Sequence, residues 1–151
     1  TITKSITILC DGTIGGVLAS GTNGVVINAA ATDAVTLSGL DIEGVSTGLS
    51  GVNFLAGGSL TIRNSRINGF RSTGSGVNFT PSATSSLFIS DTKISNSGVL
   101  ATTGGITVKP GAAGAANVHL TRVDVDRCTL APVAVVEVFI GRDATRDGQR
   151  L

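Results

Sequence analysis

Two carboxylates near residue 125 stand at a spacing that suits hydrolysis of a glycosidic bond. Asp124 and Asp126 are two positions apart, and Arg127 follows directly. On one β-strand, residues i and i+2 share a face and lie about 6.6 Å apart, within the roughly 5 to 9.5 Å that separates the paired carboxylates of glycosidases. The same pair is common on exposed strands without any catalytic role. We therefore assign no catalytic residue, and Asp124, Asp126 and Arg127 are the candidates to test first.

The remaining reactive residue types form no recognisable site. His119 is the sole histidine, and no Ser or Cys nucleophile with a paired acid accompanies it. Cys10 and Cys128 lack the Cys-x-x-Cys or Cys/His spacing of a metal site. The stretch Gly111–Ala116 lacks the Gly-Lys-Ser/Thr ending of a phosphate loop and is predicted to be a turn. We expect a surface histidine, two reduced packing cysteines, and neither a cofactor nor a metal.

The composition indicates one aliphatic, glycine-rich domain. The 151 residues include 21 Gly and 41% hydrophobic residues, but five Phe and no Trp or Tyr, and chains of about 100 to 200 residues usually form one domain. Eleven basic and ten acidic residues leave no electrostatic footprint for nucleic acid. No apolar run approaches the roughly 18 residues of a membrane helix, and no signal peptide is visible. We expect neither nucleic acid nor membrane as a partner.

The elements that must position these residues are copies of one unit. Short runs of alternating apolar and polar residues predict strands with one buried face. Four copies align: Val35–Gly44, Leu60–Gly69, Leu87–Asn96 and Val118–Arg127. Their third residues are 25, 27 and 31 positions apart, and a second series, beginning at Gly24, Gly51, Gly76 and Gly105, runs between them. Periods of 20 to 50 residues mark solenoids, propellers or arrays.

The repeat content selects a fold class. No window of 12 or more residues has a helical period free of internal glycine, which excludes helical repeats, and a propeller blade of about 40 residues exceeds the period. We predict an all-β fold, a right-handed parallel β-helix (single-stranded β-solenoid) of about five rungs over residues 1–130. With rungs about 4.8 Å apart, Cys10 and Cys128 lie too far apart for a disulfide.

Outward residues of equivalent strands should form columns along this solenoid. Two predicted columns are Asp41, Arg66, Lys93 and Asp124, and then Glu43, Asn68, Ser95 and Asp126. Asp41 would pair with Arg66 and Lys93 with Asp124, as an exposed ionic ladder worth about 0 to 1 kcal/mol per pair. The alternative interpretation is a carbohydrate groove. His119 should point outward in the column of Thr36, Thr61 and Phe88, and Asn53 and Asn78 could stack their amides.

The repeat pattern resembles a known family. The opening Thr1–Thr13 and its continuation Leu18–Asn28 look like the early rungs of uncharacterised secreted members of the bacterial right-handed β-helix repeat proteins related to the pectate-lyase superfamily. The resemblance covers about residues 1 to 130 and implies a secreted or cell-surface parent protein. It also implies polysaccharide chemistry, although alternating acids and bases differ from the clustered carboxylates that bind Ca²⁺ in family lyases.

Residues 131–151 depart from the repeat. Ala131–Ile140 is apolar and the rest is polar and rich in Arg and Asp, so we predict an atypical C-terminal strand and tail in the same domain, and a fragment of a longer protein. Open strand edges invite pairing, so we expect a homo-oligomer, most simply a two-fold dimer, through this C-terminal region; the alternative is a self-capped monomer. The predicted function is a non-catalytic structural or binding module of unknown ligand. The alternative is a polysaccharide lyase or glycosidase, or an inactive remnant of one.

Overall fold

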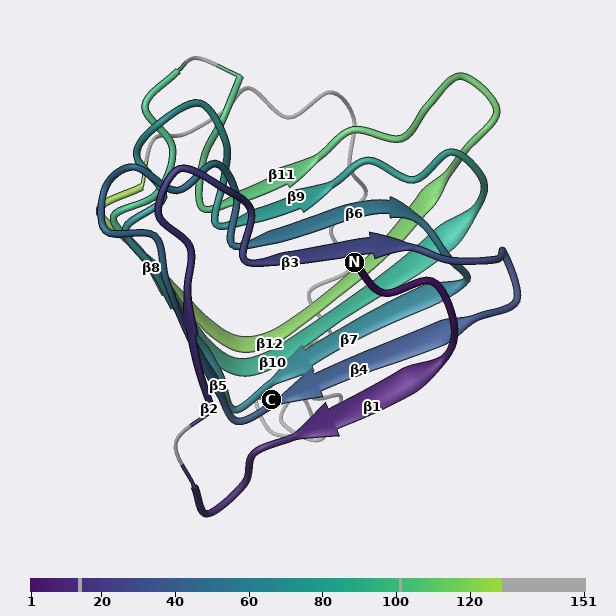
Figure 1. The fold of residues 1–151 in the computed structure, drawn as a ribbon. Helices are drawn as coiled ribbons and strands as arrows, with labels where there is room; N and C mark the ends of the chain where they lie inside the picture. Colours follow the sequence, from purple (N-terminus) through teal and green to yellow (C-terminus); the bar gives the residue numbers. More distant parts are fainter. Residues whose placement is uncertain (14, 101, 129–151) are drawn as a thin grey trace, which may run out of the picture.

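The chain folds as a parallel β-helix. The computed structural model describes residues 1–13, 15–100 and 102–128, and in this part every strand pairs in parallel and no helix is present (Figure 1). No helix there is long and apolar enough to cross a membrane. The all-β class and the solenoid predicted from the repeats are confirmed. The predicted C-terminal strand and tail, residues 131–151, lie outside the described residues.

Three faces run along the solenoid. The first face contains β1 (Ile6–Leu9), β4 (Ala34–Ser38), β7 (Ser59–Arg63) and the first halves of β10 (Ser85–Ser95) and β12 (Ala116–Asp126). The second face contains β2 (Gly15–Leu18), β5 (Leu40–Glu43), β8 (Arg66–Asn68) and the second halves of β10 and β12. The third face contains β3 (Val25–Asn28), β6 (Val52–Ala56), β9 (Val77–Phe79) and β11 (Ile106–Val108). The solenoid makes about four turns, close to the five rungs predicted.

The strand register reproduces the repeat alignment. On the first face Leu37 pairs with Ile62 and Ile62 with Ile89, so the copies found in the sequence are stacked rungs. Their inward side chains are buried columns of Val, Ile and Leu, because alternate residues of a strand point to one side. The third face adds Phe54 and Phe79, whose rings stack with centroids 4.4 Å apart.

A left-handed residue bends the chain between the first and second faces in each later rung. The residues at this bend are Gly39, Asn64, Asp91 and Arg122, with φ between 48° and 71°. Gly, Asn and Asp tolerate this region better than other residues. The bend follows the same repeat position each time, which is why the two faces keep their angle along the solenoid.

Buried hydroxyls satisfy the backbone beside the bend. The Leu40 N–H donates to Ser65 Oγ over 3.2 Å, and the Ser65 N–H donates to Thr92 Oγ1 over 3.4 Å. Ser65 and Thr92 are themselves buried. A buried N–H without an acceptor costs about 1 to 3 kcal/mol, so these inward hydroxyls stabilise the bend, and the sequence analysis did not foresee them.

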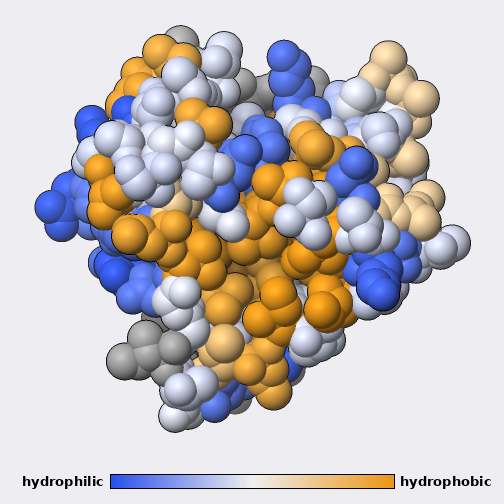
Figure 2. Space-filling view, in the orientation of Figure 1, coloured by the Kyte–Doolittle hydropathy of each residue, from blue (hydrophilic) through white to orange (hydrophobic). Residues whose placement is uncertain are grey.

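The end of the solenoid formed by β1, β2 and β3 is apolar. Ile6 is 43% exposed, Leu9 58% and Leu18 71%, whereas Val35, which pairs with Ile6 one rung further on, is 1% exposed. Figure 2 shows apolar side chains gathered across the middle of this view, in which β1 and β3 lie nearest the reader. The core column of the first face is therefore partly open to solvent at this end, whereas Ile27 on the third face is buried and pairs with Ile2.

Candidate functional site

The ionic ladder predicted on the second face is confirmed. Asp41 lies opposite Arg66, and Lys93 lies between Arg66 and Asp124. Arg66 Nη2 is 2.9 Å from Asp41 Oδ2, and Lys93 Nζ is 3.1 Å from Asp124 Oδ2. The hydrogen bond from Arg66 to Asp41 is the main reason why the pKa of Arg66 is raised. All four side chains are about half exposed, so each pair is worth only about 0 to 1 kcal/mol.

The neighbouring outward column is a chain of hydrogen bonds. Asn68 Nδ2 donates to Glu43 Oε2 over 2.8 Å, and Ser95 Oγ donates to Asn68 Oδ1 over 2.9 Å. Asn96 Nδ2 also donates to Asn68 Oδ1 over 2.8 Å. These amide and hydroxyl groups link three successive rungs, which indicates a role in holding the rungs in register.

The three candidate residues of the glycosidase hypothesis lie together on β12 and the turn that follows. Asp124 is paired with Lys93, and Asp126 Oδ2 is 3.1 Å from Arg127 Nε. Arg127 has φ 51°, so it also forms the second bend of its rung, in line with Asn96 and Gly69 of the preceding rungs. Both carboxylates thus have cationic partners, and the three residues stay candidates to test, without a catalytic assignment.

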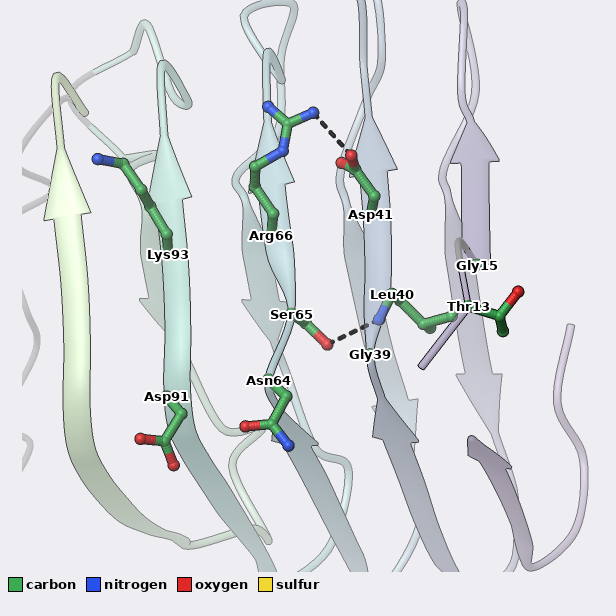
Figure 3. A pocket seen from close by; sticks show the side chains of 10 residues that line it. All are labelled: Thr13, Gly15, Gly39, Leu40, Asp41, Asn64, Ser65, Arg66, Asp91 and Lys93. Atoms are coloured by element: carbon green, nitrogen blue, oxygen red, sulfur yellow. Dashed lines mark hydrogen bonds and ion pairs between the residues drawn. The ribbon is translucent and has the colours of Figure 1, made fainter. Parts of the chain in front are cut away.

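The second face has a hollow beside the part of the ladder formed by Asp41, Arg66 and Lys93. It has a volume of about 500 Å³, and its side chains include those of Thr13, Asp41, Asn64, Arg66, Asp91 and Lys93 (Figure 3). A smaller hollow of about 350 Å³ adjoins it between Gly16, Leu18, Asp41 and Glu43. Asp124, Asp126 and Arg127 are not among the residues that line either hollow. The repeat alignment placed the columns correctly, but it carried no signal for where the surface is hollowed.

Asp41 borders both hollows and has one unsatisfied oxygen. Its Oδ2 accepts the hydrogen bond from Arg66, whereas Oδ1 is shielded from solvent and has no hydrogen-bond partner in the described part of the chain. Gly16 precedes Asp41 in the column, and a Cβ built there would meet nothing within 4 Å. Asp41 therefore keeps one carboxylate oxygen, Oδ1, that the ion pairs of the ladder do not satisfy.

A bidentate ion pair joins the bend residues of two neighbouring rungs, Asp91 and Arg122. Arg122 Nη2 lies 2.7 Å from Asp91 Oδ2, and Arg122 Nε bonds Asp91 Oδ1. The hydrogen bond from Arg122 is the main cause of the lowered pKa of Asp91. The sequence analysis missed this pair, although the aligned copies already put the two residues at one repeat position.

The other predicted columns are also present. Phe88 and His119 stack with ring centroids 4.9 Å apart, next to Thr61 in the first face. Asn78 Nδ2 donates to Asn53 Oδ1 over 2.9 Å on the third face. Cys10 and Cys128 are both free thiols, as predicted. Burial is the main cause of the raised pKa of Cys128.

In residues 1–13, 15–100 and 102–128, no three His, Cys, Asp or Glu side chains are grouped so as to hold a metal ion. Comparisons with protein-family models, with curated proteins and with solved structures give no match. The arrangement on the second face can bind hydroxyl and charged groups through paired acids and bases.

Proposed function

We propose that this chain is a non-catalytic structural or binding β-helix module that self-associates through an end of its solenoid. The observation that carries the proposal is the apolar end at β1 and β2, where Ile6, in line with the buried Val35, is 43% exposed and Leu9 and Leu18 are also exposed. Large exposed apolar patches rimmed by polar residues mark interaction sites, and a free strand edge is a template for pairing. The outward column of the second face, by contrast, carries acids and bases that pair between rungs.

The predicted dimer contact through the C-terminal region is the alternative surface for this self-association. Ala131–Ile140 is a segment of ten residues that is apolar except for Glu137, which suits pairing with a strand edge or with the same segment of another copy. The resemblance to secreted repeat proteins of the pectate-lyase superfamily, and with it a secreted or cell-surface parent, rests on the repeat pattern.

Sedimentation velocity of the purified full chain tests the proposal. We expect a species of twice the chain mass at micromolar concentration that dissociates on dilution. The variant V135K/F139K tests the C-terminal contact, because two charges in an apolar interface core prevent its burial. A monomer at every concentration would overturn the proposal of self-association.

A polysaccharide-active enzyme is the second candidate, favoured by the hollow beside Asp41. The unsatisfied Oδ1 of Asp41 would accept a hydrogen bond from a sugar hydroxyl after a rotation of the carboxylate. Arg66 and Lys93 would face an acidic group of the sugar. Polygalacturonate and other acidic glycans, incubated with the protein and Ca²⁺, should then give products that absorb as unsaturated sugars. Activity that falls in Asp41→Ala would favour an enzyme with its site in this hollow, and activity that falls in Asp124→Ala would favour the carboxylate pair on β12. The absence of product would favour the non-catalytic module.

A further inference from the structure

The first strand of the solenoid is fixed at both ends before any partner binds. At its start, Ser5 Oγ donates to Asp33 Oδ1 over 2.7 Å and accepts from the Ala34 N–H over 3.1 Å. At its end, Ser38 Oγ donates to Asp11 Oδ1 over 3.0 Å. β1 is thus held against β4 in a defined register, and its other edge is a pre-organised row of backbone groups, which lowers the entropy cost of pairing with another strand.

Two opposite charges flank this edge. Lys4 precedes β1 and Asp11 follows it, and neither makes an ion pair within the described residues. The acids and bases of the ladder on the second face, by contrast, are paired between rungs. An antiparallel copy of β1 would bring Lys4 of one chain close to Asp11 of the partner subunit, and would do so twice by symmetry.

We propose that two copies of this chain join end to end through β1, which pairs antiparallel with β1 of the partner subunit around a two-fold axis at Thr7. With Thr7 at the axis, Ile6 lies opposite the partner's Ile8, so that inward residues of the two cores meet on the same side. Ile6, which is 43% exposed in the single chain, is then covered. This inference rests on the proposed self-association and specifies its surface and symmetry.

Head-to-tail stacking fits the same end less well. If the first rung continued the solenoid of another copy, the repeat register would set Leu18 against Asp126 and Gly16 against Asp124, because these residues share columns. Two carboxylates would meet an apolar residue and a glycine, and Lys4 would gain no acidic partner from Asp11. Asp124 and Asp126 already have Lys93 and Arg127 as partners and would gain none in such a stack. The two-fold arrangement, by contrast, gives Lys4 an acidic partner and is therefore favoured.

Sedimentation velocity of full-length variants tests the inference. Ile6→Lys should give a monomer, since a lysine on a strand edge blocks pairing. Leu55→Lys, on β6 and of similar exposure at 39%, is the matched control and should stay dimeric. Circular dichroism and urea unfolding of both variants verify that they are folded.

Charge reversal gives a second readout that leaves the core unchanged. Lys4→Glu should weaken the dimer about tenfold, because two like-charge contacts replace two attractive ones. The double variant K4E/D11K should restore part of the affinity, because it re-forms both opposite-charge contacts although it removes the acceptor of the Ser38 hydroxyl. Recovery in the double variant is specific to an antiparallel pairing of β1.

The outcomes separate this inference from the proposed function. If Ile6→Lys and both charge variants leave the dimer affinity unchanged, but V135K/F139K abolishes the dimer, self-association stands and the β1 interface is wrong. If the chain forms species that grow without limit as concentration rises, the two-fold symmetry is wrong. A wild-type chain that is monomeric throughout overturns both.

Discussion

The first rung and the interior rungs are built from the same repeat, but their inward residues have different surroundings. Ile6 and Val35 are register partners of similar type, yet the first is 43% exposed and the second 1%. The interior strand has a rung on either side, whereas β1 is paired on one side only within the part of the chain that the structure describes. In a solenoid, burial therefore depends on the position of a rung along the stack as well as on its alternation of apolar and polar residues.

The outward residues of the two regions differ as well. Interior rungs carry charged or amide side chains in the second-face columns, and these bond from rung to rung. The first rung carries Gly16 and Leu18 at the equivalent positions. Interior rungs thus hold one another through paired polar groups, while the first rung presents an apolar rim, as expected of a surface that contacts another chain.

The largest expected effect compares a fully buried and a partly buried position of one inward column. Leu37→Ala should lower the free energy of unfolding by about 2 to 5 kcal/mol, because it leaves a cavity in a closed core. Ile8→Ala, at the position that pairs with Leu37 in the first rung, should cost less than half as much in the monomer. Urea unfolding of the two variants at low protein concentration measures both. Equal losses would mean that the first rung is packed as tightly as the interior.

A smaller effect is expected at the bend between the first and second faces. Ser65→Ala removes the acceptor of the Leu40 N–H and should cost about 1 to 3 kcal/mol. Ser65→Thr keeps a hydroxyl, as Thr92 does in the next rung, and should retain most of the stability. Chemical denaturation of the three proteins compares them, and an alanine variant as stable as the wild type would show that the hydroxyl is dispensable.

The smallest effect is a pH dependence that arises at the Asp91–Arg122 pair. The pKa of Asp91 is lowered in the folded chain, chiefly by the hydrogen bond from Arg122, so the unfolded chain takes up this proton at a higher pH. The stabilisation is complete above the unfolded value of about 3.9 and is lost as the pH falls through the lower folded value. Asp91→Asn should flatten the dependence of the urea midpoint on pH below about 4.

The Asp91→Asn variant introduces a residue type that the fold already has at this bend, and one result would contradict the prediction. Asn64 occupies the same left-handed bend position one rung earlier, so the substitution should not strain the backbone. An acid dependence as steep in Asp91→Asn as in the wild type would show that other carboxylates are responsible. Asp33, whose pKa is also lowered, chiefly by the hydrogen bond from Ser5, is the next residue to vary.

The fold and the outward columns could be predicted because both follow from two periods. Alternation along a strand tells inward from outward residues, and the repeat of about 25 to 31 residues tells which of them stack. The pairs Asp41–Arg66 and Lys93–Asp124 needed no further information. The column that holds Phe88 and His119 was found in the same way.

What could not be predicted depends on backbone detail within the rung. The bend at Gly39, Asn64, Asp91 and Arg122 needs a left-handed residue, and only the first three are types that favour it. Without the bend, the role of the Ser65 hydroxyl cannot be anticipated. The contact of Asp91 with Arg122 was missed although the two residues share a repeat position. The smaller of the two hollows beside Asp41 likewise depends on Gly16, because a glycine leaves space that the periodicity of the sequence does not reveal.

Hydrogen–deuterium exchange at two protein concentrations tests the central claim, that the first rung is an association surface and the interior is closed. We expect amides of β1 to exchange slowly at high concentration and faster on dilution, because their second edge is covered only in the dimer. Amides of β7, which pair on both sides, should exchange slowly at both concentrations. Exchange of β1 that does not change with concentration would contradict the claim.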